Sequence, residues 1–158
     1  RLTDLSEGAF HPVIDDPAGT MKRDRVTRLV LCSGKVYYDL AAKEIPGDVA
    51  VVRVEELFPW PHADLTWLLD GYTALREVVW AQEEPKNQGA WTWVAPRLRG
   101  TVGNAVTIRY AGRPERASPA EGYTQAHNDE QARIVADALS TAPRGPGQRR
   151  SSGVLQVL

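Results

Sequence analysis

Two adjacent carboxylates, Glu83 and Glu84, are the groups in this sequence best placed to do chemistry. They follow a short apolar run, residues 78–81, which is typical of a buried parallel strand, and Pro85 is expected to stop that strand. Polar groups at the carboxyl ends of buried strands mark the edge where open α/β sheets bind ligands. Paired acids can serve as acid and base when their surroundings separate their pKa values, although capping and pairing with arginines are the more frequent roles.

The segment Cys32-Ser33-Gly34-Lys35 lies where a strand is expected to pass into a helix, so its backbone N–H groups could hold an anion. A phosphate-binding loop would also need an earlier glycine and a Ser or Thr after the lysine, and this sequence has neither. We therefore interpret Ser33 as the N-cap of the helix and Cys32 as a buried residue. Cys32 is not expected to be a nucleophile, because no histidine lies near it in the sequence.

Three arginines, Arg109, Arg113 and Arg116, are concentrated at and after the last expected strand, on a segment with two prolines. Arginines held on a rigid loop suit bidentate recognition of a phosphate or carboxylate group. Pairing with strand-end glutamates such as Glu55 or Glu83 explains the arginines equally well. The sequence leaves both alternatives open.

Five tryptophans are many for a chain of this length. Trp60, Trp67 and Trp80 fit core positions on their expected elements. Trp91 and Trp93 are two residues apart, so on a helix they point in different directions and at least one of them is expected to be exposed. An exposed tryptophan suggests a contact surface for another domain or subunit, and a core with two sides is the alternative.

The composition excludes several classes of function. With 19 Lys+Arg against 20 Asp+Glu in 158 residues, the net charge of −1 gives no nucleic-acid footprint. No apolar stretch approaches the roughly 20 residues that cross a bilayer, and no signal peptide is expected. The single cysteine permits no intrachain disulfide, and the three histidines, which lack metal-ligand spacing, are His11, His62 and His127. Because the first residue is Arg1 and not Met, we expect a piece of a longer protein.

Strand and helix patterns alternate along most of the chain. They predict strands over 28–32, 48–54, 78–81 and 106–110, and helices over 35–44, 62–72, 88–98 and within 121–138. This alternation favours a three-layer α/β fold with a mainly parallel sheet flanked by helices. We expect residues 28–140 to form that domain, residues 1–27 to be an N-terminal arm or interdomain linker, and residues 141–158 to be a disordered tail.

Several segments, taken in order, resemble one enzyme family. Residues 31–40, 52–61, 80–91, 110–114 and 117–123 closely resemble the C-terminal region of the E1 component of 2-oxoglutarate dehydrogenase, a thiamine-diphosphate enzyme. The likeness covers about residues 5 to 140. The paralogous E1 component of 2-oxoadipate dehydrogenase is similar enough in this region to be an alternative.

The resemblance implies a transketolase C-terminal-like domain that follows two thiamine-binding domains and helps to assemble the E1 homodimer. The full enzyme of the citric acid cycle decarboxylates 2-oxoglutarate and transfers the succinyl group to lipoyl-E2. Thiamine diphosphate and Mg²⁺ would be bound outside this chain, which has no Gly-Asp-Gly motif with a downstream asparagine, so no catalytic, cofactor or metal residue is expected here. The implied partners are the preceding domains, the second E1 subunit and E2, with no nucleic acid or membrane. The implied location is the cytoplasm, or the mitochondrial matrix in a eukaryote.

Some members of this family bind a nucleotide or acetyl-CoA effector near this domain. The residues expected to contribute here are Arg113, Arg116 and Lys35, and Arg113 is the first to test. An effector-binding module is therefore an alternative function for the chain. A free-standing interaction protein that uses Trp91 and Trp93 is a third alternative.

Overall fold

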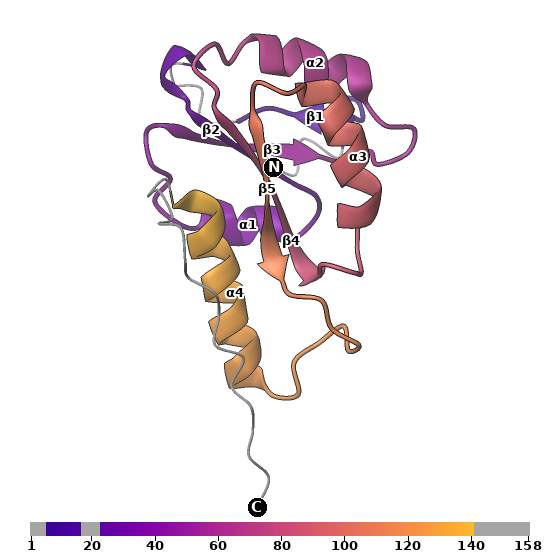
Figure 1. Ribbon diagram of the computed structural model, residues 1–158, viewed down its shortest axis with the longest axis vertical. Helices are drawn as coiled ribbons and strands as arrows, with labels where there is room; N and C mark the ends of the chain where they lie inside the picture. Colours follow the sequence, from indigo (N-terminus) through magenta and orange to yellow (C-terminus); the bar gives the residue numbers. More distant parts are fainter. Residues whose placement is uncertain (1–5, 17–22, 141–158) are drawn as a thin grey trace, which may run out of the picture.

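A sheet of five strands forms the middle layer of the fold (Figure 1). The computed structural model describes residues 6–16 and 23–140, and the predicted tail over 141–158 lies outside them. The strands lie in the order β1 (Val13–Ile14), β3 (Val49–Val54), β2 (Arg28–Cys32), β4 (Glu77–Pro85) and β5 (Thr107–Arg113). β1 pairs antiparallel with β3, and all the other pairings are parallel. The predicted α/β fold with a mainly parallel sheet is confirmed.

Helices cover both faces of this sheet. The elements are a 3₁₀ helix, η2 (Arg23–Arg25), and the helices α1 (Val36–Ala41), α2 (His62–Asp70), α3 (Trp91–Val102) and α4 (Thr124–Leu139). α2 and α3 pack on one face, and α1 and α4 pack on the other (Figure 1). In residues 6–16 and 23–140, no helix has both the length and the apolar character that a membrane span requires.

Each central strand contributes side chains to two separate cores. Successive residues of a strand point to opposite faces, so Val78 and Trp80 of β4 join the core under α2 and α3. Val79 and Ala81 join the core under α1 and α4. Burial on both faces explains why these strands are unbroken apolar runs in the sequence.

The described part of the N-terminal arm packs against the sheet edge and the end of α2. β1 covers part of the outer edge of β3, and the Asp16 carboxylate accepts a hydrogen bond from the Val51 N–H of that strand at 3.3 Å. Asp15 accepts a 2.6 Å hydrogen bond from the Tyr72 hydroxyl and pairs with Arg23. A covered edge cannot pair with another chain, so these contacts protect the sheet. The division of the chain at residue 27 stays a prediction.

Two strands end later than the sequence predicts. The apolar run over 78–81 is only the centre of β4, which continues through Glu84 to Pro85. β5 likewise continues to Arg113, because the two strands pair again at Pro85 and Arg113 after a register shift. The periodicity of apolar residues cannot show this pairing, since residues 82–84, which separate the two paired parts of β4, are polar. Arg113 therefore lies at the end of a strand and not on a loop.

Two helix starts also differ from the prediction. Lys35 occupies the N-cap position of α1 without a side-chain cap, so the prediction of Ser33 as N-cap is wrong. Gly34, with φ 71°, turns the chain between Ser33 and the helix. α3 starts at Trp91 instead of residue 88, because residues 86–90 form the turn after β4.

The tryptophan predictions are partly confirmed. Trp80 is fully buried and Trp60 packs against the same core. The core prediction for Trp67 is wrong, since its side chain is 73% exposed. Leu65 and Leu68 define the buried face of α2, and Trp67 lies about 200° around the helix from Leu65.

Trp91 and Trp93 are both half-buried, so the expectation that one of them is exposed is wrong. Trp91 packs on the ring of Tyr110 at a centroid distance of 5.1 Å. Trp93 contacts the ring of Phe58 at 5.8 Å and donates its Nε1 proton to the Leu57 carbonyl at 2.9 Å. The two rings point in different directions as predicted from their spacing, but tertiary contacts cover both of them.

Candidate functional site at the carboxyl edge of the sheet

The parallel strands β2, β4 and β5 end at Cys32, Pro85 and Arg113, and this end of the sheet is called the carboxyl edge. The buried amide of Gln82 lies at its centre. Gln82 is 4% exposed and lies on β4, which has a strand on either side. Its Oε1 accepts hydrogen bonds from Trp80 Nε1 and from the Trp91 backbone N–H, both at 3.0 Å. Its Nε2 lies within 2.9 to 3.2 Å of three carbonyls in the following turn, those of Glu84, Pro85 and Gln88. One side chain therefore satisfies polar groups of the strand end, the turn and the first residue of α3.

The turn after β4 also depends on glycine at position 89. Gly89 has φ 64°, a left-handed backbone conformation that residues other than glycine rarely adopt. A Cβ atom at this position would lie 3.0 Å from the Glu84 Cβ. A 2.8 Å hydrogen bond from the Gln88 N–H to the Pro85 carbonyl closes the turn. Backbone conformation and the Gln82 amide thus fix the same short segment.

Tyr110 closes this edge from β5. Its hydroxyl lies 3.0 Å from the Glu84 carbonyl and 2.9 Å from the Arg113 carbonyl. Gly112 follows on the same face of the strand, and a Cβ there would overlap the Tyr110 hydroxyl. Burial raises the pKa of Tyr110 to about 12, so the hydroxyl keeps its proton well into the alkaline range and donates it to one of these carbonyls at a time.

Arg113 and Arg116, two of the residues predicted to bind an effector, come together on Glu121. Arg113 is 4% exposed, donates to the Pro119 carbonyl at 3.2 Å, and its Nη2 lies 3.1 Å from His127 Nδ1. Its Nε faces Glu121 Oε1 at 3.9 Å, and Arg116 binds the other oxygen of Glu121 at 3.0 Å. The buried side chain of Arg113 therefore holds the loop over 114–123 on its inner side, and the side chain of Arg116 is more exposed to solvent.

The arginine loop is also tied to the turn after β4. The Arg116 N–H donates to Asn87 Oδ1 at 3.0 Å. The Arg116 carbonyl accepts hydrogen bonds from Asn87 Nδ2 and Gln88 Nε2, each at 3.0 Å. Three hydrogen bonds at one residue hold two segments that are nearly 30 residues apart in sequence.

Lys35, the third predicted effector residue, lies in a different cluster. Its Nζ binds Glu83 at 2.8 Å and Asp39 at 3.2 Å, and Gln131 Nε2 donates to both carboxylates. The hydrogen bond to Glu83 is the largest cause of the raised pKa of Lys35. Within the described ranges no hydrogen bond or ion pair joins Lys35 to Arg113 or Arg116.

The pairing interpretation of the strand-end glutamates is the one that the structure shows. Glu83 pairs with Lys35, and Glu55 pairs with Arg53 at 2.8 Å. Arg109 is separate from the other two arginines, because it points to the opposite end of the sheet and binds Glu77 at 3.1 Å. The acidic pairs and the arginines of the sequence are therefore mostly partners of neighbouring charges.

The side chain of Cys32 is fully buried in the core. Burial raises the pKa of its thiol to about 12, and the charge of Glu55 adds to this shift. The thiolate, which is the reactive form, is therefore scarce at neutral pH, as expected for a structural cysteine. Among residues 6–16 and 23–140, no three His, Cys, Asp or Glu side chains are grouped so that they could hold a metal ion.

Sequence reasoning missed Gln82 and Tyr110 as the organising residues of this edge. Gln82 is the first polar residue after the apolar run over 78–81, and a single amide in that position carries a weak signal. The spacing of Tyr110 and Gly112, two residues apart on one strand face, could have indicated a ring lying over a glycine.

The amino-acid sequence of the chain matches one protein family. A family model described as "2-oxoglutarate dehydrogenase C-terminal" matches residues 1–139. A 2-oxoglutarate dehydrogenase E1 component of Exiguobacterium sp. is 44% identical over 141 residues, which is 86% of this chain and 15% of the relative. The E1 components of Haemophilus influenzae and Azotobacter vinelandii are each 43% identical, over 88% of this chain and 15% of each relative. The chain thus spans about 15% of the length of these relatives, and their names favour 2-oxoglutarate over 2-oxoadipate dehydrogenase.

Replacement of Gln82 by methionine should destabilise the domain strongly. Gln82→Met keeps the approximate volume but leaves the Trp80 Nε1–H, the Trp91 N–H and the Gln88 carbonyl without a partner. The Glu84 and Pro85 carbonyls keep the Tyr110 hydroxyl and the Gln88 N–H as donors. We expect a loss of about 3 kcal/mol or more in the free energy of unfolding. Urea denaturation followed by tryptophan fluorescence measures this loss. Gln125→Met, at an exposed position on α4, is the matched control and should change stability by less than about 0.5 kcal/mol. Equal stability of the two variants would contradict the role of Gln82.

Stability should fall as the pH rises above about 9. The unfolded Cys32 thiol loses its proton near its ordinary value of 9.0, whereas the folded thiol keeps its proton up to about 12. Between these values the unfolded state binds fewer protons, so the free energy of unfolding falls by up to about 1.4 kcal/mol per pH unit for this group. Cys32→Ala removes this contribution and should flatten the profile between pH 9 and 10, where Tyr110 contributes least. A profile unchanged by this substitution, measured by urea denaturation, would show that the burial of the thiol has no such effect.

Proposed function

The chain belongs to the 2-oxoglutarate dehydrogenase C-terminal family, and from that membership we propose that it is the C-terminal architectural domain of an E1 subunit. The structural observation that supports this role is the carboxyl edge, where buried polar groups bind one another and hold two segments in fixed positions. Such an edge presents a rigid surface to a neighbouring domain. Its charged groups are engaged in ion pairs, which suits docking better than acid–base chemistry.

We further propose that the full-length subunit decarboxylates 2-oxoglutarate and transfers the succinyl group to lipoyl-E2 in the citric acid cycle. Thiamine diphosphate and Mg²⁺ would be held by domains outside this chain. The sequence of this chain contains no Gly-Asp-Gly segment with a downstream asparagine, the motif expected to hold the Mg²⁺-diphosphate. We therefore assign no step of the decarboxylation to this domain, whose part would be assembly.

The proposed partners follow from this role. They are the preceding domains of the same subunit, the second E1 subunit and the E2 component. The exposed Phe58, which contacts the half-buried Trp93, and the exposed Trp67 lie on or beside the face that α2 and α3 cover. Aromatic residues are enriched at interfaces, which supports a docking role for this face.

A chimera tests the proposed function. In it, this chain replaces the matched C-terminal region of the Exiguobacterium relative, and the relative truncated before that region is the comparison. We expect the chimera to form an E1 homodimer in light-scattering measurements and to support NADH formation in the reconstituted complex, because it restores the missing domain. The truncated relative should do neither. A chimera that dimerises and turns over no better than the truncated relative would contradict the proposal.

As a second candidate function, we propose an effector site for a nucleotide or acetyl-CoA at the carboxyl edge. Lys35, Arg113 and Arg116 come at the ends of β2 and β5, so all three cations lie at this one edge of the sheet. The side chains of Lys35 and Arg116 are 68% and 39% exposed and could exchange a carboxylate for a phosphate. The 5% exposed side chain of Arg113 would hold the loop in place beneath them.

Thermal denaturation with acetyl-CoA or AMP tests this site. At a saturating concentration we expect the ligand to raise the Tm of the 158-residue chain by about 4 °C, because it binds only the folded state. Lys35→Met and Arg116→Gln should each remove most of this shift, since each removes a phosphate-binding charge. Arg99→Gln, an exposed residue in the last turn of α3, is the control and should leave it intact. No shift with the parent chain would rule the site out for this domain.

A further inference from the structure

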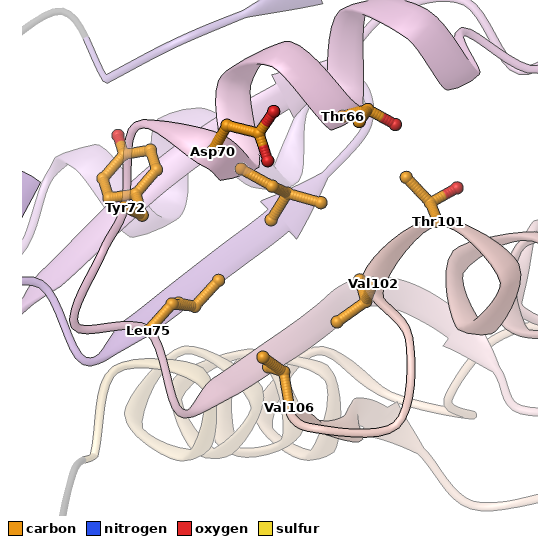
Figure 2. A pocket seen from close by; sticks show the side chains of 8 residues that line it. Thr66, Asp70, Tyr72, Leu75, Thr101, Val102 and Val106 are labelled. Atoms are coloured by element: carbon orange, nitrogen blue, oxygen red, sulfur yellow. The ribbon is translucent and has the colours of Figure 1, made fainter.

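A small pocket opens between the C-terminal ends of α2 and α3, away from the carboxyl edge (Figure 2). Its volume is about 190 Å³, and four half-buried apolar side chains line it, those of Leu69, Leu75, Val102 and Val106. In Figure 2 Asp70 and Thr66 lie above the pocket, Leu75 and Val106 lie below it, and Thr101 and Val102 lie beside each other at its right. This volume is too small for most cofactors and matches one extended side chain.

The hydroxyl groups of Thr66 and Tyr72 can offer a ligand only an acceptor. Thr66 donates its hydroxyl proton to the His62 carbonyl at 2.8 Å. Thr101 donates to the Arg97 carbonyl at 3.0 Å, and its oxygen is already occupied, because it accepts from Trp60 Nε1 at 3.1 Å and lies 3.0 Å from His62 Nδ1. Tyr72 donates to Asp15 at 2.6 Å. Each hydroxyl has one proton, so none remains to donate into the pocket.

The backbone adds no donor on the α2 side. The N–H groups of Gly71 and Tyr72 bind the carbonyls of Leu68 and Leu69, and the Leu75 N–H binds the Tyr72 carbonyl. Asp70 adds a carboxylate at the rim, and in the described part of the chain it has no hydrogen bond or ion pair. On the α2 side the ligand must therefore supply the hydrogen-bond donors.

The electrostatic field at the pocket also favours a cation. α2 ends at Asp70 and α3 ends at Val102, so two helix C-termini with their partial negative charges converge on it. Arg23 lies against Gly71 directly after α2, where it stacks on the ring of Tyr72 at 5.5 Å and is paired with Asp15. An apolar wall, the acceptors on the α2 side of the rim and a carboxylate without an ion pair together match the aliphatic stem and charged head of a basic side chain.

Trp67 indicates that this basic side chain belongs to a polypeptide. It lies on α2 one turn before Asp70 and is 73% exposed. A free small cation would leave this ring uncovered, whereas a peptide whose basic side chain enters the pocket would lie across it. Tryptophan is also the aromatic residue that best attracts a cation.

We propose that the pocket between α2 and α3 binds a lysine or arginine side chain of a partner polypeptide, with Asp70 as its counter-ion and Trp67 covered by the partner backbone. This inference rests on the docking role that the proposed function gives to this face, and it names the chemistry of the partner; the probe titrations test the pocket without the full-length subunit. It concerns the face of the domain opposite α1 and α4, and it assigns a role to the tryptophan that the core does not use.

The charge requirement is tested first with a small probe. n-Butylguanidinium is titrated into the 158-residue chain, with N-butylurea as the neutral molecule of the same shape, and the methyl resonances of Leu69, Leu75, Val102 and Val106 are followed by NMR. We expect saturable shifts with the cation only, and about tenfold weaker binding in Asp70→Asn. Asp64→Asn, an exposed carboxylate on the same helix, is the matched control and should bind as the parent does. Equal binding of the two probes, or no effect of Asp70→Asn, would overturn the proposal.

The polypeptide requirement is tested with the peptide acetyl-Leu-Arg-Leu-amide and its citrulline analogue. We expect the arginine peptide to bind about tenfold more tightly than n-butylguanidinium and to perturb the Trp67 indole resonance, whereas the citrulline peptide should lose this affinity. Trp67→Ala should weaken the peptide and leave the small probe unchanged. Binding of the peptide no tighter than n-butylguanidinium would show a site for a free cation and would overturn the assignment of a polypeptide.

Discussion

The two-sided burial of the sheet is the constraint on which the rest of this structure depends. Because helices cover both faces, the side chains of the central strands are apolar except near the two ends of the strands. Polar groups can therefore gather only at the two ends of the sheet and in the turns beyond them. Towards the carboxyl end of β4 the first polar residue is Gln82. Its side chain is buried in the core, and its amide binds the turn that follows the strand.

Glutamine meets this requirement where other side chains of similar size do not. The turn presents backbone carbonyls and N–H groups at once, and an amide offers a carbonyl oxygen and two N–H donors. A carboxylate could accept from Trp80 and Trp91 but would repel the turn carbonyls, and an apolar chain would leave both kinds of group without partners. The left-handed Gly89 and the covered Gly112 complete an arrangement in which rigidity comes from satisfied hydrogen bonds and not from apolar packing alone.

The fold class could be predicted from the sequence because the periodicity of apolar residues determines most of the strands and helices. The starts of β2, β3 and α2 could be predicted within a residue, since each begins where an apolar pattern begins. The ends of β4 and β5 could not, because their last pairing joins Pro85 to Arg113 across a register shift that only the neighbouring strand determines. Trp67 shows the converse: its hydrophobicity predicts burial, but its angle on α2 places it in solvent, and that angle outweighs residue type.

The two ends of the domain differ in how far their charged groups are already paired, and therefore differ as candidate sites. At the carboxyl edge, Glu121 and Glu83 already neutralise the predicted cations, so a ligand there would have to displace an existing partner. At the pocket between α2 and α3, the helix termini and Asp70 bring negative charge together. Arg23 lies behind the end of α2 at Gly71, but in the described residues Asp70 itself has no ion pair. This convergence could not be predicted from the sequence, because Asp70 and Val102 are separated by more than 30 residues and meet only after both helices pack on the sheet. A partner would gain more binding free energy at the Asp70 carboxylate than at the carboxyl edge, because binding there breaks no existing ion pair of the domain.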